Sequence, residues 1–328
     1  VFVMERKNAW KSCDEAKLAQ VNALCADYIK FISDCKTERE CVEESIRLAE
    51  AAGYKNLNDC IEAGTPLKAG DKVYANNMGK TLALFVVGTE PMEKGMHILG
   101  AHIDSPRIDV KQNPLYQDED FALLDTHYYG GIKKYQWGTI PLALHGVIIR
   151  ADGSSVKVNI GEDESDPVFC VTDLLPHLAQ DQMKRSAGEI LKGEELNILI
   201  GSRPFRDDDV SEKVKLNIIA ILNEKYGICE EDFLSAELEI VPAANAKDLG
   251  FDRSLIGSYA HDDRVCSYPN LMALLDTEEC RRTAVCLLTD KEEVGSMGVT
   301  GLRSDYLKNF IEELCVNASQ NVRKALAN

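Results

Sequence analysis

Apolar residues recur at helical spacing near the start of the chain. The segment 10–32 carries them three or four positions apart, at Leu18, Val21, Leu24, Tyr28 and Ile32. This period predicts an amphipathic helix. Thr37-Glu38-Arg39-Glu40 then matches a capping box, which predicts a second helix that begins there and ends at Gly53.

Two short apolar runs follow, each bounded by turn residues. They are TLALFVV at 81–87 and Met96–Ala101, and their length and flanks predict buried strands. Helices that precede and flank such strands indicate a layered architecture. We therefore expect an α/β fold with a mixed central sheet flanked by helices.

The pattern changes between residues 107 and 235, where Gly, Pro and Asp become more frequent. Short apolar pieces there predict strands at Leu142–Arg150, Val156–Ile160 and Leu196–Ile200, and helical spacing predicts a helix at Val210–Tyr226. We interpret residues 107–235 as an inserted, mostly β domain.

The α/β pattern resumes near residue 236. The expected elements are a strand at Ala236–Val241, a helix at Asp262–Asp276, a strand at Ala284–Leu288 and a helix near Asp305–Leu314. Residues 1–106 and 236–328 would then form one discontinuous α/β domain.

The composition of the chain excludes two classes of binding partner from our expectations. The 328 residues include 37 Lys+Arg against 54 Asp+Glu, for a formal net charge of −17. An acidic chain repels nucleic acid and anionic lipid, so neither is an expected partner. The eleven cysteines are odd in number and form no Cys-x-x-Cys pair, which indicates free thiols in a reducing cytoplasm.

Three clusters carry candidate chemistry: His102-Ile103-Asp104, Tyr259–Arg264 and Thr289–Ser296. The first and third follow predicted strands, and ligands bind at the carboxyl ends of strands in open α/β sheets. Each also has a simple structural interpretation. These are a core histidine with a turn aspartate, a helix N-cap at Asp262, and a solvated loop at Glu292-Glu293. Together they offer the ligands that zinc, cobalt or manganese prefer.

Five blocks in this order resemble the aspartyl aminopeptidase family of co-catalytic zinc metallo-aminopeptidases. They are GAHIDSPR, Tyr129–Trp137 (YGGIKKYQW), Asp173–Ala179 (DLLPHLA), YAHDDR and DKEEVGSMG. The resemblance implies a zinc-peptidase-like catalytic α/β domain. It also implies that residues 107–235 form a dimerisation domain, which builds an even-numbered homo-oligomer. The implied activity is removal of N-terminal residues from peptides, with a preference for acidic ones.

The resemblance also implies roles for individual residues. His102 resembles a metal ligand, Asp104 the partner that fixes its imidazole tautomer, and Asp262 a carboxylate bridging two divalent ions. Glu292 resembles the general base and Glu293 a ligand of the other ion.

His177, in Pro176-His177-Leu178, matches a family histidine that reaches the active site of a neighbouring subunit. An interface histidine without a catalytic role explains the same match.

The family pattern needs two more ligands, an aspartate and a histidine, nearer the C-terminus. After Glu293 the only side-chain carboxylates are those of Asp305, Glu312 and Glu313, and that segment contains no histidine. Because tight sites use three or four protein ligands per ion, we expect this chain to be a fragment of a longer protein, inactive by itself.

Two alternatives stay open. The missing ligands favour a catalytically inactive homologue that keeps the assembly domain. His261-Asp262 also resembles the doublet of an all-helical, metal-dependent phosphohydrolase class, although the predicted strands argue against that fold.

Overall fold

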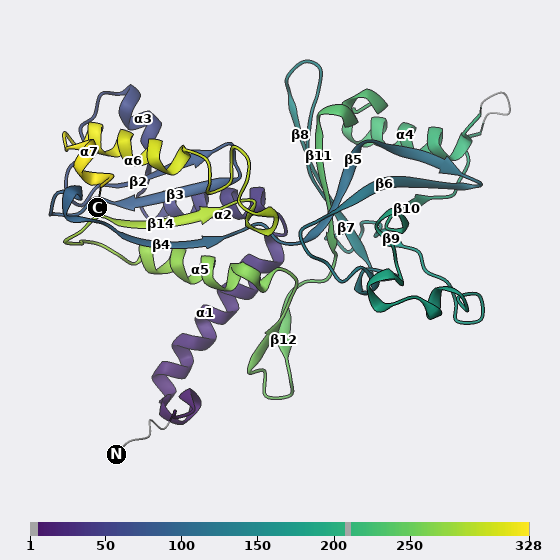
Figure 1. Cartoon of the computed structure of the whole chain (residues 1–328), viewed down its shortest axis with the longest axis horizontal. Coiled ribbons are helices and arrows are strands. Elements are labelled where there is room, and N and C mark those ends of the chain that lie inside the picture. Colours follow the sequence, from purple (N-terminus) through teal and green to yellow (C-terminus); the bar gives the residue numbers. More distant parts are fainter. Residues whose placement is uncertain (1–5, 207–210, 328) are drawn as a thin grey trace.

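The structure, a computed structural model, describes residues 6–206 and 211–327. Two large β-sheets lie side by side along its long axis (Figure 1). Most of the helices pack around one sheet, whereas few helices cover the other sheet. The expected α/β fold is confirmed.

The first sheet is mixed and has five strands in the order β1-β2-β3-β14-β4. Their bounds are β1 Lys55–Asn56, β2 Lys72–Asn77, β3 Thr81–Val86, β14 Ala284–Thr289 and β4 His97–His102. β14 comes from late in the sequence, yet it pairs between β3, antiparallel, and β4, parallel. The carboxyl ends of β4 and β14 therefore meet at one edge.

Helices cover both faces of this sheet. Their bounds are α1 Glu15–Asp34, α2 Glu38–Ala51, α3 Leu57–Glu62, α5 His261–Leu275, α6 Tyr306–Asn317 and α7 Val322–Ala325. Side chains alternate along a strand, so Leu82 and Leu84 face α1, α2 and α5, whereas Ala83 and Phe85 face α3, α6 and α7. The result is a three-layer α/β/α arrangement.

The capping box at Thr37 is formed as expected. The Thr37 side chain accepts from the backbone N–H of Glu40, and the Glu40 carboxylate accepts from the backbone N–H of Thr37. The first helix begins later than its pattern suggested, at Glu15, because Trp10 lies in a separate 3-10 turn.

The second sheet is antiparallel, with seven strands in the order β8-β7-β11-β5-β6-β10-β9. Their bounds are β5 Arg107–Asp118, β6 Phe121–Tyr129, β7 Leu142–Ile149, β8 Ser155–Ile160, β9 Cys170–Val171, β10 Ile198–Gly201 and β11 Ala236–Pro242. Helix α4, Lys213–Tyr226, packs Ile218 and Leu222 against its core. A hairpin of β12, Lys247–Leu249, and β13, Leu255–Gly257, projects from the region between the two sheets (Figure 1).

Two expectations for these segments need correction. The strand at 236–241 does not resume the first sheet, because β11 pairs along its whole length with β7. Its alternating apolar side chains, Leu238 and Ile240, fill the second core instead. The helix expected from Val210 begins at Lys213, and Val210 itself lies outside the described residues.

A buried charge network joins the two sheets. Glu38 at the start of α2 lies 2.8 Å from Lys80 and 3.2 Å from Arg107 of β5. Arg107 also contacts Glu239 of β11 at 3.1 Å. Burial raises the pKa of Glu38, but Arg107 and Lys80 outweigh it and hold that pKa well below its ordinary value. Carboxylate and cations therefore stay charged in the interior.

All eleven cysteines are free thiols. Within residues 6–206 and 211–327, none of the helices combines the length and apolar character that a bilayer span requires.

Candidate metal centre

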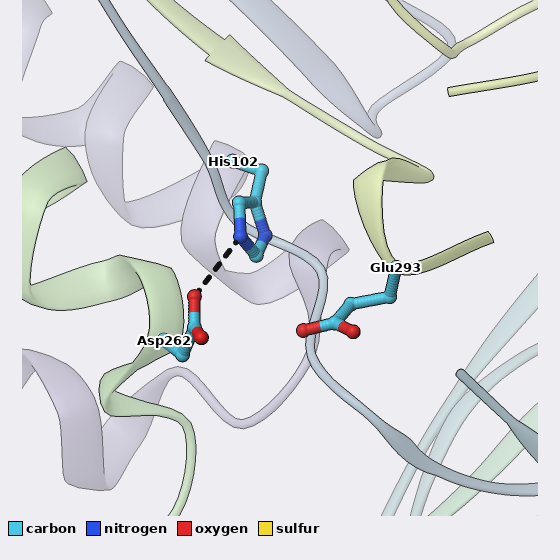
Figure 2. Close-up of side chains that lie close together, drawn as sticks. All are labelled: His102, Asp262 and Glu293. Carbon is cyan, nitrogen blue, oxygen red and sulfur yellow. Dashed lines mark hydrogen bonds and ion pairs between the residues drawn. The ribbon is translucent and has the colours of Figure 1, made fainter. Parts of the chain in front are cut away.

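The three candidate clusters come together where β4 and β14 end. His102 is the last residue of β4 and lies opposite Thr289 in the parallel ladder. Asp262 lies in the first turn of α5, and Glu293 lies in the 3-10 turn Glu292–Val294 that follows β14. Figure 2 shows the three side chains directed toward one common space.

The ligand atoms of this cluster are close enough to share a cation. One atom each from His102, Asp262 and Glu293 lies within 4.8 Å of the others. His102 Nε2 is 3.2 Å from Asp262 Oδ1 and 3.7 Å from Glu292 Oε2. The His102 side chain is only 9% exposed, whereas that of Asp262 is 86% exposed. The cluster is therefore open to solvent on one side.

The other imidazole nitrogen is held by Asp104. His102 Nδ1 lies 3.0 Å from the Asp104 carbonyl oxygen and 3.3 Å from its carboxylate Oδ1. An N–H on Nδ1 that donates to these oxygens leaves the Nε2 lone pair directed at Asp262. Burial lowers the pKa of His102, but the bonds to Asp104 outweigh it and raise that pKa to about 9. A cation must therefore displace a proton from Nε2 at neutral pH.

Asp104 is fully buried and accepts three further bonds. Tyr129 Oη donates to Oδ2 at 2.7 Å, and the backbone N–H groups of Glu292 and Glu293 donate at 3.1 and 3.2 Å. Burial raises the pKa of Asp104, but the bonds from His102 and Tyr129 outweigh it and lower that pKa. Asp104 thus remains ionised and ties the histidine to the turn that carries the two glutamates.

Sequence analysis did not identify two residues that support the site, Tyr129 and Arg264. Tyr129 lies in the YGGIKKYQW block, but nothing local indicates that its hydroxyl reaches Asp104. Arg264, in YAHDDR, is fully buried and donates to the carbonyl oxygens of Ile103, Cys35 and Lys36 at 2.6–3.1 Å. Because the acceptors of these hydrogen bonds are backbone atoms, no pattern of residue types predicts them.

His177 lies elsewhere. It follows β9 in the other sheet's segment, is exposed, and is flanked by the exposed Leu174, Leu175 and Leu178. Within one chain, among the described residues, the His102 cluster receives no side chain from this segment.

A second acidic cluster is a charge network and offers no free cation site. Glu38, Glu237 and Glu239 also place carboxylate oxygens within 4.8 Å of one another. Lys80 contacts Glu38 and Glu237, and Arg107 contacts Glu38 and Glu239. The protein's own cations therefore occupy the space that an ion would need.

The protein has a mixed sheet between two layers of helices, with a histidine–carboxylate cluster at the ends of adjacent strands. This combination is typical of metal-dependent α/β enzymes. A family model, Aminopeptidase I zinc metalloprotease (M18), matches residues 31–327. The chain belongs to this family, and it is a metal-dependent aminopeptidase that hydrolyses peptides. The family resemblance is confirmed, and the phosphohydrolase alternative is wrong because it required an all-helical fold.

Individual relatives agree. A probable M18 family aminopeptidase 1 from Clostridium acetobutylicum is 55% identical over 331 residues, covering 100% of this chain and 71% of the relative. The crystal structure of an M18 aminopeptidase from Thermotoga maritima matches with a TM-score of 0.91 at 42% identity, covering 99% of this chain and 70% of that one.

A more distant structure, the mApe1 dodecamer from S. cerevisiae, shares the fold. Its TM-score is 0.70 at 19% identity, covering 91% of this chain and 67% of that one.

Proposed function

We propose that the protein removes N-terminal residues from peptides with two divalent ions, held in part by His102, Asp262 and Glu293. The observation that carries this is the convergence of three ligand atoms within 4.8 Å from three separate elements. One imidazole nitrogen and carboxylate oxygens suit zinc, with cobalt or manganese as the next choices. Asp262, the most exposed of the three, is the proposed bridging carboxylate.

Bound ions of this kind polarise a carbonyl and lower the pKa of water. Glu292 is the proposed general base. Its side chain is 57% exposed and its Oε2 lies 3.7 Å from His102 Nε2, so it can accept a proton from water at the edge of the cluster. Its neighbour Glu293 faces the ligand space (Figure 2). The two adjacent carboxylates can therefore divide base and ligand roles.

The test separates these two roles in the full-length protein. Glu292→Gln should keep its metal content and lose at least ~100-fold in turnover, the scale of a lost general base. Glu293→Gln should lower metal occupancy, measured by elemental analysis after dialysis. The exposed Glu278 in the loop after α5 provides the control Glu278→Gln, which should change neither quantity. Near wild-type turnover in Glu292→Gln would remove it from the mechanism.

We further propose that residues 107–235, together with β11, form a dimerisation domain of an even-numbered homo-oligomer. Edge strands β8 and β9 and the exposed leucines around His177 supply surface for such contacts. The dodecamer of the yeast relative supports closed assembly. In this arrangement His177 of one subunit would reach the site of another. Sedimentation as a clean monomer at micromolar concentration would contradict both proposals.

We also propose a preference for acidic N-terminal residues and a cytoplasmic location. The resemblance to the aspartyl aminopeptidase family supports the acidic preference. The eleven free cysteines support the cytoplasmic location. Comparing hydrolysis of an aspartyl and a leucyl chromogenic amide tests the preference, and faster cleavage of the leucyl amide would contradict it. Fractionation of cells of the source organism tests the location.

A further inference from the structure

The YGGIKKYQW block has no place in the mechanism above, yet its first two residues lie against the candidate metal centre. Strand β6 of the second sheet ends at Tyr129, and Gly130 follows it. Tyr129 donates a hydrogen bond to Asp104, and a Cβ added at Gly130 would meet Glu293. The last residue of a strand in one sheet and the glycine after it therefore lie beside two residues of a site built on the other sheet.

We propose that Tyr129 and Gly130 are positioning residues for the metal centre, setting the places of Asp104 and Glu293 from the second sheet. This inference rests on the proposed metal centre. It assigns part of the site's geometry to the segment otherwise proposed only for assembly.

The Tyr129 hydroxyl is itself held firmly. The ring is buried, and the Arg107 guanidinium lies over its face at 4.0 Å from the ring centre. Arg107 is fixed in turn by Glu38 at 3.2 Å, Glu239 at 3.1 Å and Asp109 at 2.8 Å. A ring stacked on a cation with three carboxylate partners has little freedom to turn. Its hydroxyl therefore presents a fixed donor.

That donor decides where the Asp104 carboxylate lies. Oδ2 accepts from Tyr129 Oη at 2.7 Å and from the Glu293 N–H at the longer distance of 3.2 Å. A bond to a carboxylate at 2.7 Å is short and strong. Without it, Oδ2 keeps only the weaker backbone donor, and the carboxylate can rotate away from His102 Nδ1. The imidazole then keeps the Asp104 carbonyl oxygen at 3.0 Å but loses the carboxylate Oδ1 at 3.3 Å, one of the two partners that orient Nε2.

Gly130 acts by leaving space. Its φ is +68°, and a Cβ placed on it would lie 3.1 Å from Glu293 Cβ and 3.4 Å from Glu293 Oε2. The same Cβ would lie 3.4 Å from Pro106 Cβ. Because Pro106 is rigid, the glutamate side chain is the neighbour that would have to move. A side chain at this position, on a backbone conformation that L residues rarely adopt, would therefore push Glu293 out of its present place.

The test measures Co²⁺ affinity in the full-length protein by the visible absorption of the bound ion, with circular dichroism to confirm folding. Tyr129→Phe keeps the stacked ring and removes only the hydroxyl, so we expect about 10-fold weaker binding, the lower end for groups that orient ligands. Its neighbour Tyr128 is 37% exposed, and Tyr128→Phe should bind as the wild type does. Gly130→Ala should weaken binding by at least ~10-fold, whereas Gly131→Ala, with nothing within 4 Å of the new Cβ, should not.

A double variant distinguishes positioning through Asp104 from an independent effect. If Tyr129 acts through Asp104, Tyr129→Phe combined with Asp104→Asn should bind no more weakly than Asp104→Asn alone. Additive losses, or unchanged affinity in Tyr129→Phe, overturn the role of Tyr129. Unchanged affinity in Gly130→Ala overturns the role of Gly130. The two variants touch different residues, so each remains informative if the other does not fold.

Failure of the metal centre itself has its own signature. If His102→Gln leaves Co²⁺ affinity unchanged, the proposed centre is wrong and this inference falls with it. If His102→Gln abolishes binding while both Tyr129→Phe and Gly130→Ala bind normally, the centre stands and only the positioning role is refuted.

Discussion

His145 of the second sheet contacts α2 of the first, and its replacement should lower the free energy of unfolding by an amount that depends on pH. It is fully buried on β7, with Nδ1 2.8 Å from Glu40 of α2 and Nε2 3.0 Å from Glu162 beyond β8. Lys36 also faces this cluster, 3.7 Å from Glu162. Burial lowers the pKa of His145, but Glu162 and Glu40 outweigh it and raise that pKa above its ordinary 6.5. Below about pH 6.5 the imidazole is therefore a cation shared by two glutamates.

The magnitude follows from what remains after His145→Gln. Breaking a buried pair costs roughly 3–5 kcal/mol. Here Glu40 keeps two backbone donors, the N–H groups of Lys36 and Thr37, and Glu162 keeps Lys36. We therefore expect a loss of roughly 2–4 kcal/mol in the free energy of unfolding at about pH 6.

The sign of the pH dependence follows from the raised pKa. Stabilisation by a protonated histidine is fully present below its unfolded pKa and is lost as the pH rises through its folded pKa. The deficit of His145→Gln should therefore shrink above about pH 6.5, by about 1.4 kcal/mol for each unit of raised pKa. Urea unfolding followed by circular dichroism, at about pH 6 and again about three units higher, measures it.

The exposed histidine of β6 provides the control, since His127→Gln should unfold as the wild type does at both pH values. An equal deficit for His145→Gln at both pH values would refute the reasoning, because it would show that His145 carries no proton-dependent stabilisation.

A further prediction concerns the metal centre. Arg264→Lys should cost roughly 2–4 kcal/mol in urea unfolding and weaken Co²⁺ binding, because one ammonium cannot replace a guanidinium bonded to three carbonyls, among them that of Ile103. The exposed Arg253 supplies the control Arg253→Lys, and an unchanged affinity in Arg264→Lys would count against this reasoning.

Elements with strong local signals were predictable from the sequence. The Thr37 capping box and the apolar runs of β3, β4 and β14 agree with the structure to within one or two residues at the ends that were predicted. A cap and a hydrophobic period act within a few residues, so the local sequence contains the information. The ordered family blocks carried the recognition of the metallopeptidase family in the same way.

Long-range pairing was not readable in this way. The AELEIV run predicts a strand equally well in either sheet, and only packing of Leu238 and Ile240 against the second core assigns β11 to it. The long hairpin of β5 and β6 was missed because its polar and apolar residues alternate irregularly around a register shift between Val110 and Leu115. A strand's partner depends on which apolar faces meet, and that is a property of the whole fold.

The site divides along the same line. The clusters that contain His102, Asp262 and Glu293 could be located from residue types and places beside strands and a helix, which are local features. The family resemblance then singled out these three residues as candidate ligands. That these three converge depends on β14 inserting between β3 and β4, which brings residues 102 and 289 opposite each other. The Tyr129 hydroxyl and the Arg264 guanidinium reach the site across 25 and 161 residues of sequence. Contacts at such separations form only when the sheets have packed, so the tertiary structure alone decided them.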